Sequence, residues 1–315
     1  MERIKKSIKD SCFDADFFIC LSVLAAMAVY YYGLRAFVII ALLAAVSAIC
    51  VSLTARLRKK PYDPDSLLAA VFSGIMLALM FPASVPFYIA VICGIFSELI
   101  VIGTFGGHGK EIFSGAAAGY VLGEICFPEE ILRYPSVFSG GTSLAIPDNL
   151  PASFSRTMLT ADSSPHSELE IILGRTFSPM GTGVVLLLAV IALYLMLKGK
   201  LSFIVFLSQT AVYGIFSAVY GSGFAEAEYN LCSGMYLFVS VFAVCGKYPE
   251  RLGHRIIYGI FSGAFICLFR YYSLQENPAV YASLISAAFC AVLKQREKTI
   301  GEGGESIEKR TGTTA

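Results

Sequence analysis

Charged residues are scarce in this sequence. Asp, Glu, Lys and Arg together make up 15% of its 315 residues, whereas 56% are hydrophobic and the mean hydropathy is +0.69. A soluble domain carries about 25% charged residues, so the composition excludes an ordinary soluble fold and indicates a chain that contacts a lipid bilayer. No basic cluster is interleaved with aromatic residues as a nucleic-acid surface would need, which argues against nucleic acid as a partner.

The signatures of many soluble enzymes are also missing. The nine cysteines include no C-x-x-C pair, and most lie in apolar runs, where a thiol behaves as a small hydrophobic group. A metal or cluster ligand shared with another subunit is the alternative. His108, His166 and His254 show no ligand spacing and are interpreted as surface residues. No P-loop is present, and no strand-helix unit surrounds Gly103–Gly109. We therefore assign no catalytic residue and no metal site.

What the sequence does contain is a series of apolar runs. A helix needs about 20 residues to cross a bilayer, and ten runs approach that length. They predict an all-α polytopic membrane protein with spans at Phe17–Tyr32, Phe37–Leu53, Leu67–Phe81, Val85–Ile102, Ile112–Cys126, Gly183–Leu197, Leu201–Tyr220, Leu231–Cys245, Ile256–Phe269 and Ala279–Leu293.

The basic residues predict an orientation for these spans. With the amino terminus in the cytoplasm, only five of the Lys and Arg residues fall on the far side: Arg35, Arg133, Arg156, Arg175 and Arg270. Because basic residues prefer the cytoplasmic side of a membrane, we expect both termini there. The protein is then a multi-pass protein of a bacterial cell (inner) membrane.

A weak internal repeat divides the ten spans into two sets of five. Gly94-Ile95-Phe96-Ser97 recurs 165 residues later as Gly259-Ile260-Phe261-Ser262. Since each half has five spans, such a repeat must be inverted in the membrane, and inverted repeats often build a site where they meet. The sequence thus predicts two inverted five-helix halves.

These observations predict four segments. The first membrane half covers residues 1–126, an extracytoplasmic loop covers 127–182, and the second half covers 183–294. Residues 295–315 are polar and Gly-rich, and we expect a disordered cytoplasmic tail there.

The extracytoplasmic loop contains the only stretch that favours a cofactor site. Ser139-Gly140-Gly141-Thr142 places two hydroxyls around glycines, which let the backbone approach an anion and offer amides to it. From these residues alone, a plain turn is the alternative. Arg175 lies on the same side and is a candidate partner for a phosphate.

One acidic residue lies inside a predicted span. Glu98 falls within the fourth span, where an ionisable group is costly and therefore indicates function. It is a candidate residue of a Na⁺ or H⁺ path, and a polar contact with a neighbouring subunit is the alternative.

Several stretches in order along the chain resemble one known family. Phe105-Gly106-Gly107-His108-Gly109, Gly119-Tyr120-Val121, Cys126-Phe127-Pro128 and the helix-breaking stretch Leu77–Pro86 resemble the D subunit of the Rnf complex. That family is similar to the B subunit of the Na⁺-translocating NADH:quinone oxidoreductase, and the likeness covers nearly the whole chain.

The resemblance implies a flavoprotein. In that family a threonine in an S-G-A-T motif carries FMN through a phosphoester bond, and Thr142 stands at the matching position of Ser139-Gly140-Gly141-Thr142. It further implies riboflavin as a second flavin, a flavin transferase as a partner, and other membrane, iron–sulfur and flavin subunits in an ion-translocating ferredoxin:NAD⁺ oxidoreductase. Gly141 replaces the motif's alanine, Ser136 stands where the family has an acidic residue, and an Asn-Pro pair expected within Glu111–Gly115 is absent.

Two other functions remain open at this point. A channel or transporter for a small solute would also use an inverted repeat. A structural membrane subunit without flavin would also fit the altered motif.

Overall fold

The computed structural model describes residues 14–59, 64–138, 144–146, 150–151, 168–220, 224–233 and 235–311. Within these ranges the chain forms helices joined by turns, without a β-strand. This confirms the all-α architecture predicted from the apolar runs.

The first half consists of five helical passages. Their bounds are α2 (Ala15–Tyr32), α3 (Leu34–Leu57), α4 (Pro64–Met80), α5 (Phe87–Ile95), which continues as the π-helix η1 (Phe96–Ile102), and α6 (Gly115–Cys126). Two short helices, α7 (Pro128–Ile131) and α9 (Glu168–Ile172), follow in the connecting region.

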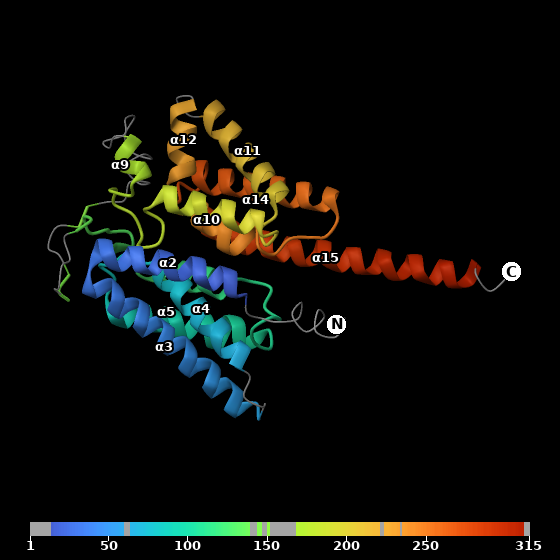
Figure 1. The fold of residues 1–315 in the computed structure, drawn as a ribbon, viewed down its shortest axis with the longest axis horizontal. Coiled ribbons are helices and arrows are strands. Elements are labelled where there is room, and N and C mark those ends of the chain that lie inside the picture. The colour runs from blue at the N-terminus through green and yellow to red at the C-terminus, as the bar shows by residue number, and fades with distance from the viewer. Residues whose placement is uncertain are drawn as a thin grey trace.

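The second half repeats this order. It contains α10 (Val185–Leu197), α11 (Phe203–Tyr220), α12 (Phe224–Cys232), α13 (Tyr236–Val239) with the π-helix η2 (Ser240–Val244), α14 (Leu252–Tyr271) and α15 (Pro278–Thr311). In Figure 1 the first half, coloured blue to green, lies below the second half, coloured yellow to red.

The bundle has a terminal end and a loop end. At the terminal end, where α2 begins and α15 leaves the bundle (Figure 1), Lys200 Nζ after α10 contacts Asp14 Oδ2 before α2 at 2.6 Å. At the loop end, the Phe138 amide donates to the Tyr31 carbonyl near the end of α2 at 2.9 Å. Because α2 begins at one end and α10 at the other, the two halves run in opposite directions.

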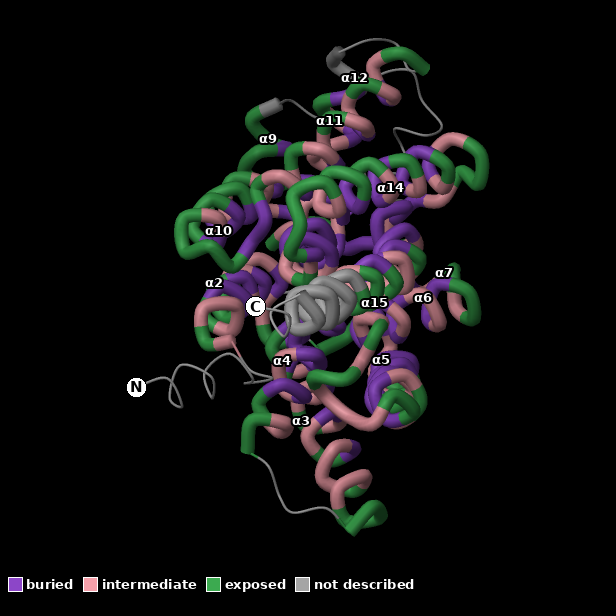
Figure 2. The backbone as a smooth tube through the Cα atoms, turned by 90° about the vertical axis from the view of Figure 1, so that its right-hand side faces the viewer, coloured by how far each residue is buried: buried purple, intermediate pink, exposed green. Residues whose placement is uncertain are grey.

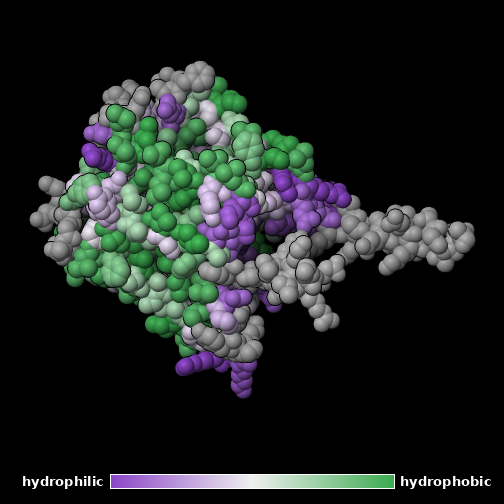
Figure 3. All heavy atoms as spheres, in the orientation of Figure 1, coloured by the Kyte–Doolittle hydropathy of each residue, from purple (hydrophilic) through white to green (hydrophobic). Residues whose placement is uncertain are grey.

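The helices are suited to a membrane. Five are long and apolar enough to cross one, namely Ala15–Tyr32, Leu34–Leu57, Phe203–Tyr220, Leu252–Tyr271 and Pro278–Glu297. Four shorter apolar helices are Pro64–Met80, Phe87–Ile102, Gly115–Cys126 and Val185–Leu197. Figure 3 shows apolar side chains over most of one face, with hydrophilic residues gathered towards the terminal end.

The eighth predicted span, Leu231–Cys245, was wrong as a single helix. The chain breaks between α12 and α13, and Met235 there adopts a left-handed conformation with φ of 57°. This conformation lies outside the right-handed helical region and is uncommon for a residue with a side chain. The helical hydrogen bonds of α12 therefore cannot continue through Met235. Sequence hydropathy could not reveal this break, because the residues on both sides are apolar.

The predicted disordered tail also differs from the structure. The last helix continues as far as Thr311, well beyond the bundle (Figure 1). The sequence of this extension contains several Glu, Lys and Arg residues, which are good helix formers and offset its glycines.

The repeat is visible in how two glycines pack. A Cβ on Gly94 of α5 would meet Leu43 Cδ2 of α3 at 2.8 Å. A Cβ on Gly259 of α14 would meet Ser208 Cβ of α11 at 3.0 Å, and both residues of this second contact are 165 positions later in the chain. The equivalent helices therefore approach through equivalent glycines.

The core lies where the two halves meet. Figure 2 shows buried residues concentrated in the middle of the bundle, between the exposed outer helices. The end of α4 and the turn after it are buried from Ile75 to Val85, so this segment lies inside the bundle, away from its surface. This central position holds the polar groups described next.

Candidate functional site

The predicted flavin-attachment residues lie outside the part of the chain that the structure describes. These are Ser139, Gly140, Gly141 and Thr142. The residues on either side of this stretch are described. The residue before it contacts α2, and the residue after it contacts α3.

Phe138 directly precedes the stretch and contacts α2. Its amide donates to the Tyr31 carbonyl, and its ring lies against Tyr31 and Tyr30, with centroids 5.3 and 5.6 Å apart. Tyr30 is 67% exposed and Phe138 is 54% exposed. These three rings, the aromatic cluster, therefore present apolar faces beside the predicted attachment residues.

Arg35 binds the chain just after the stretch. This arginine stands in the first turn of α3 and is 5% exposed. Its Nη1 donates to the Leu144 carbonyl, while Nε donates to the Ala83 carbonyl at 2.6 Å and Nη2 to the Val85 carbonyl at 2.8 Å. One buried guanidinium thus fixes both the turn after α4 and the chain two residues beyond Thr142.

Arg175, the predicted phosphate partner, is exposed. Its amide donates to the Glu170 carbonyl at 2.8 Å. The neighbouring Leu173 carbonyl accepts from the Tyr31 hydroxyl at 2.9 Å. Tyr31 therefore contacts both the segment that carries Arg175 and the segment that leads to Thr142. Sequence spacing did not suggest this link, because the two segments are far apart in the chain.

Glu98, the predicted ion-path residue, is deeply buried in η1. It is 2% exposed, and its Oε2 lies 3.0 Å from His108 Nε2. Its Oε1 is buried without a hydrogen-bond partner. The interpretation of His108 as a surface residue was wrong, since its side chain is 5% exposed. The turn after η1 folds the imidazole back onto the carboxylate.

A cavity of about 460 Å³ opens between the halves at the terminal end. From the first half it is lined by Ser73, His108, Glu111 and Ser114, and from the second half by Lys247, Ser283 and Lys294, among others. This interface cavity has the size of a small-molecule site, which is typically 300–1,000 Å³.

An ion pair crosses the mouth of the interface cavity. Glu111 Oε1 of the first half lies 2.9 Å from Lys247 Nζ of the second. Burial alone would raise the pKa of the Glu111 carboxyl, but the attraction and hydrogen bond of Lys247, a backbone hydrogen bond and His108 together hold that pKa below its usual value. The pair joins the two halves. Glu111 belongs to the stretch in which the predicted Asn-Pro pair is absent.

The loop end holds a second buried polar region between the halves. The Asn277 amide, just before α15, donates to the Tyr120 hydroxyl of α6 at 2.8 Å. Glu124, on the same helix, is 5% exposed and interacts electrostatically with Glu276. Burial raises the pKa of the neighbouring Tyr134 hydroxyl, which therefore stays neutral. The Asn277–Tyr120 bond in this region joins α6 to the start of α15.

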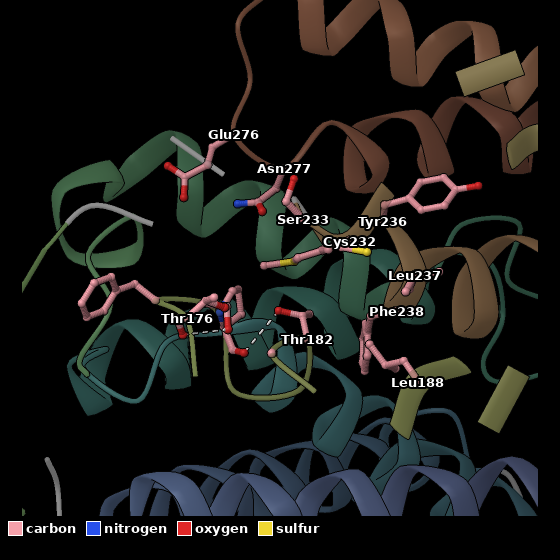
Figure 4. A pocket seen from close by; sticks show the side chains of 15 residues that line it. Thr176, Thr182, Leu188, Cys232, Ser233, Tyr236, Leu237, Phe238, Glu276 and Asn277 are labelled. Atoms are coloured by element: carbon pink, nitrogen blue, oxygen red, sulfur yellow. Dashed lines mark hydrogen bonds between the residues drawn. The ribbon is translucent and has the colours of Figure 1, made fainter. Parts of the chain in front are cut away.

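A much smaller cavity adjoins this region. Its volume is about 20 Å³, enough for about one water molecule. Figure 4 shows Thr176, Thr182, Ser233, Glu276 and Asn277 around it, contributed by three separate segments. The cavity lies beside the break between α12 and α13, where the backbone turns at Met235.

Metal ligands do not gather in the described part of the chain, where no group of three His, Cys, Asp or Glu residues could hold an ion. Cysteine thiols there are free, and most are buried.

Fold and site together define a class. The chain is an α-helical, multi-pass membrane protein of two inverted halves, with polar sites buried where the halves meet. It belongs to the NQR2, RnfD, RnfE family, whose family model matches residues 4–301.

Several relatives within this family are similar to the chain. The D subunit of an ion-translocating oxidoreductase complex from Colwellia psychrerythraea is 36% identical over 104 residues, 31% of this chain and 28% of the relative. Its counterpart from Shewanella amazonensis is 29% identical over 113 residues, 35% and 32% of the two chains. The D subunit of a Na⁺-translocating ferredoxin:NAD⁺ oxidoreductase complex from Acetobacterium woodii is 23% identical over 299 residues, 92% and 91% of the two chains. The chain thus spans about three tenths of the first two relatives and nine tenths of the third.

Proposed function

We propose that this chain is the flavin-carrying membrane subunit of an Rnf-type complex, which passes electrons between ferredoxin and NAD⁺ and moves Na⁺ or H⁺. The family match over residues 4–301 supports this, as does the relative from Acetobacterium woodii that aligns along nearly its full length. Its partners are then the other membrane, iron–sulfur and flavin subunits of that complex.

FMN is proposed to be joined to Thr142 through a phosphoester, formed by a flavin transferase. The observation that carries this proposal is that the flanks of residues 139–143 are both held at the loop end, by Tyr31 on one side and Arg35 on the other. Thr142 is two residues from Leu144, and two residues reach at most about 7 Å. The contacts of the two flanks support the loop end as the place of attachment.

The described residues around this position fit a flavin. The aromatic cluster offers exposed rings, against which a flat ring system packs well. Arg175, exposed in the segment that Tyr31 holds, would supply a cation for the phosphodiester charge. When bound, the flavin supplies one- and two-electron chemistry, and these residues orient it and balance its charge.

The interface cavity is our proposed place for a second, non-covalent flavin such as riboflavin. Its volume of about 460 Å³ suits a three-ring ligand. The Ser73 hydroxyl borders it and is buried without a hydrogen-bond partner, which is the kind of group that a ligand with several polar edges would satisfy.

The membrane placement follows from the basic residues. We infer a bacterial cell membrane, with the terminal end in the cytoplasm and the loop end outside, because Lys and Arg concentrate beside the terminal end. The covalent flavin would then lie on the outer side. Glu98, in the first turn of η1, is the proposed residue of the ion path.

The decisive test is the mass of the chain. Purified after co-expression with a flavin transferase, the wild type should carry one FMN-sized adduct and give a fluorescent band after denaturation. Thr142→Ala should lose both, whereas the neighbouring Ser143→Ala should keep them. A wild type without the adduct, under conditions in which the transferase modifies a control protein, would refute covalent attachment.

The cavity between inverted halves keeps one other function open. A transporter for a small solute would also place its site there. Solute uptake by proteoliposomes that contain this chain alone would favour transport, and a chain with neither flavin nor uptake would be a structural subunit.

A further inference from the structure

The position of Glu98 differs between the two halves. Its equivalent in the second half, 165 residues later, is Gly263 of α14. A Cβ there would meet the Gln209 carbonyl of α11 at 2.9 Å, so the second half has no room for a side chain at this point. The first half instead opens its helix into the seven-residue π-helix η1 and places a carboxylate there. Widened helical turns of this kind are frequent at functional sites.

The surroundings of Glu98 favour a proton over a metal cation. One carboxylate oxygen contacts His108 Nε2 at 3.0 Å, and the other is buried without a hydrogen-bond partner. Hard cations such as Na⁺ prefer shells of several oxygen ligands. An imidazole beside the carboxylate instead forms a donor–acceptor couple that exchanges protons.

Charged and titratable groups lie around the couple on several neighbouring elements. From α3, Cys50 lies within electrostatic reach of Glu98, and Arg58 donates to the Gly103 carbonyl just beyond η1. Glu111 lies near His108 but is itself paired with Lys247. Helix α6 packs on η1 through glycines such as Gly115, and its acidic residue, Glu124, stands at the opposite end.

His108 also connects the couple to the interface cavity. It lines the interface cavity, and Glu98 lies behind it, outside the lining. A proton from the cavity must therefore reach the imidazole before the carboxylate.

We propose that Glu98 and His108 form a proton-exchange site at the terminal end of the first half, loaded through the interface cavity. A hydronium ion in the cavity gives its proton to the neutral imidazole of His108 and leaves as water. The imidazolium that results is neutralised by the Glu98 carboxylate, and the reverse step returns the proton. The inference rests on the proposed function in one respect: it makes H⁺ the ion that this site passes.

Two experiments test this. In proteoliposomes that hold the whole complex, redox-driven proton uptake should fall on the order of 100-fold in Glu98→Gln and in His108→Asn, the loss typical of a positioned acid–base group. Glu98→Asp should restore part of it. His254→Asn removes the other described His–Glu pair, in which His254 Nδ1 lies 2.8 Å from Glu297 Oε1, and should leave uptake unchanged.

The second experiment needs only the full-length chain. Infrared difference spectra between acidic and alkaline buffer should contain a carboxylate band that Glu98→Gln removes and His108→Asn shifts. A band that neither substitution changes would overturn the site. So would radioactive sodium uptake that Glu98→Gln stops in a complex without proton uptake. A chain without flavin that keeps the band would refute the proposed function alone.

Discussion

The side-chain amide of Asn277 donates to the hydroxyl of Tyr120 at 2.8 Å, and both residues are buried. The two belong to opposite halves of the chain, because Tyr120 is on α6 and Asn277 precedes α15. This bond therefore ties the last helix of the first half to the last helix of the second. It lies at the loop end, opposite the interface cavity.

We expect Tyr120→Phe to weaken the contact between the halves. The substitution keeps the ring and leaves a buried amide without its acceptor, which costs about 1–3 kcal/mol. Thermal unfolding in detergent should occur at a lower temperature than in the wild type. Tyr88→Phe is the control, since Tyr88 is 58% exposed. Equal melting temperatures for the Tyr120 variant and the wild type would contradict a structural role for this bond.

The repeated glycines lead to a second prediction. At Gly259 a Cβ would lie 2.8 Å from the Val205 carbonyl oxygen, which is backbone, whereas at Gly94 the nearest atom is the end of the Leu43 side chain. Backbone yields less easily than a side-chain tip. We therefore expect Gly259→Ala to destabilise the protein by about 1–3 kcal/mol and Gly94→Ala by less.

Gly253→Ala provides the matched control on α14. Nothing lies within 4 Å of a Cβ there, so alanine should raise stability by up to about 1 kcal/mol through helix propensity. Unfolding curves of the three variants in one detergent test the order. If Gly94→Ala proved the most harmful, the packing inferred for the repeat would be wrong.

Much of this fold could be predicted from the sequence, because hydropathy and helix length act locally. Nine of the ten predicted spans correspond to single helical passages, counting α5 with η1 as one. The break at Met235 could not be predicted, since it depends on a backbone conformation that apolar residues do not signal. The pairing of Glu98 with His108 depends on the path of the turn between them.

Arg35 illustrates the same limit at the candidate flavin site. From the sequence it counted only as one basic residue at the non-cytoplasmic ends of the spans. In the structure it is buried and donates to carbonyls of two distant segments. The cost of burying a charge signals that such a residue has partners, but only the folded chain identifies them. The attachment motif itself, by contrast, was recognisable from its residues.

Arg35→Lys should therefore affect both stability and flavin content. A lysine ammonium lacks the planar fork that reaches several carbonyls at once, so buried acceptors are left unpaired at a cost of about 2 kcal/mol or more. If Thr142 carries FMN, the loosened flank should also lower the fraction of chains with the adduct. Arg56→Lys, at an exposed position on the same helix, should change neither the melting temperature nor the adduct.

The ion pair between Glu111 and Lys247 makes stability depend on pH. The pKa of Glu111 is lower in the folded protein than the ordinary value of 4.5, so the folded state binds this proton less readily than the unfolded chain does. The pair therefore contributes fully above about pH 4.5, and its contribution is lost as the pH falls through the folded pKa. Glu111→Gln removes this dependence. We expect the wild type to unfold at a higher temperature than the variant at neutral pH, and the difference to shrink on acidification. Glu129→Gln, at an exposed site, controls for the general loss of carboxylate charge; a difference that grows on acidification would contradict the pairing.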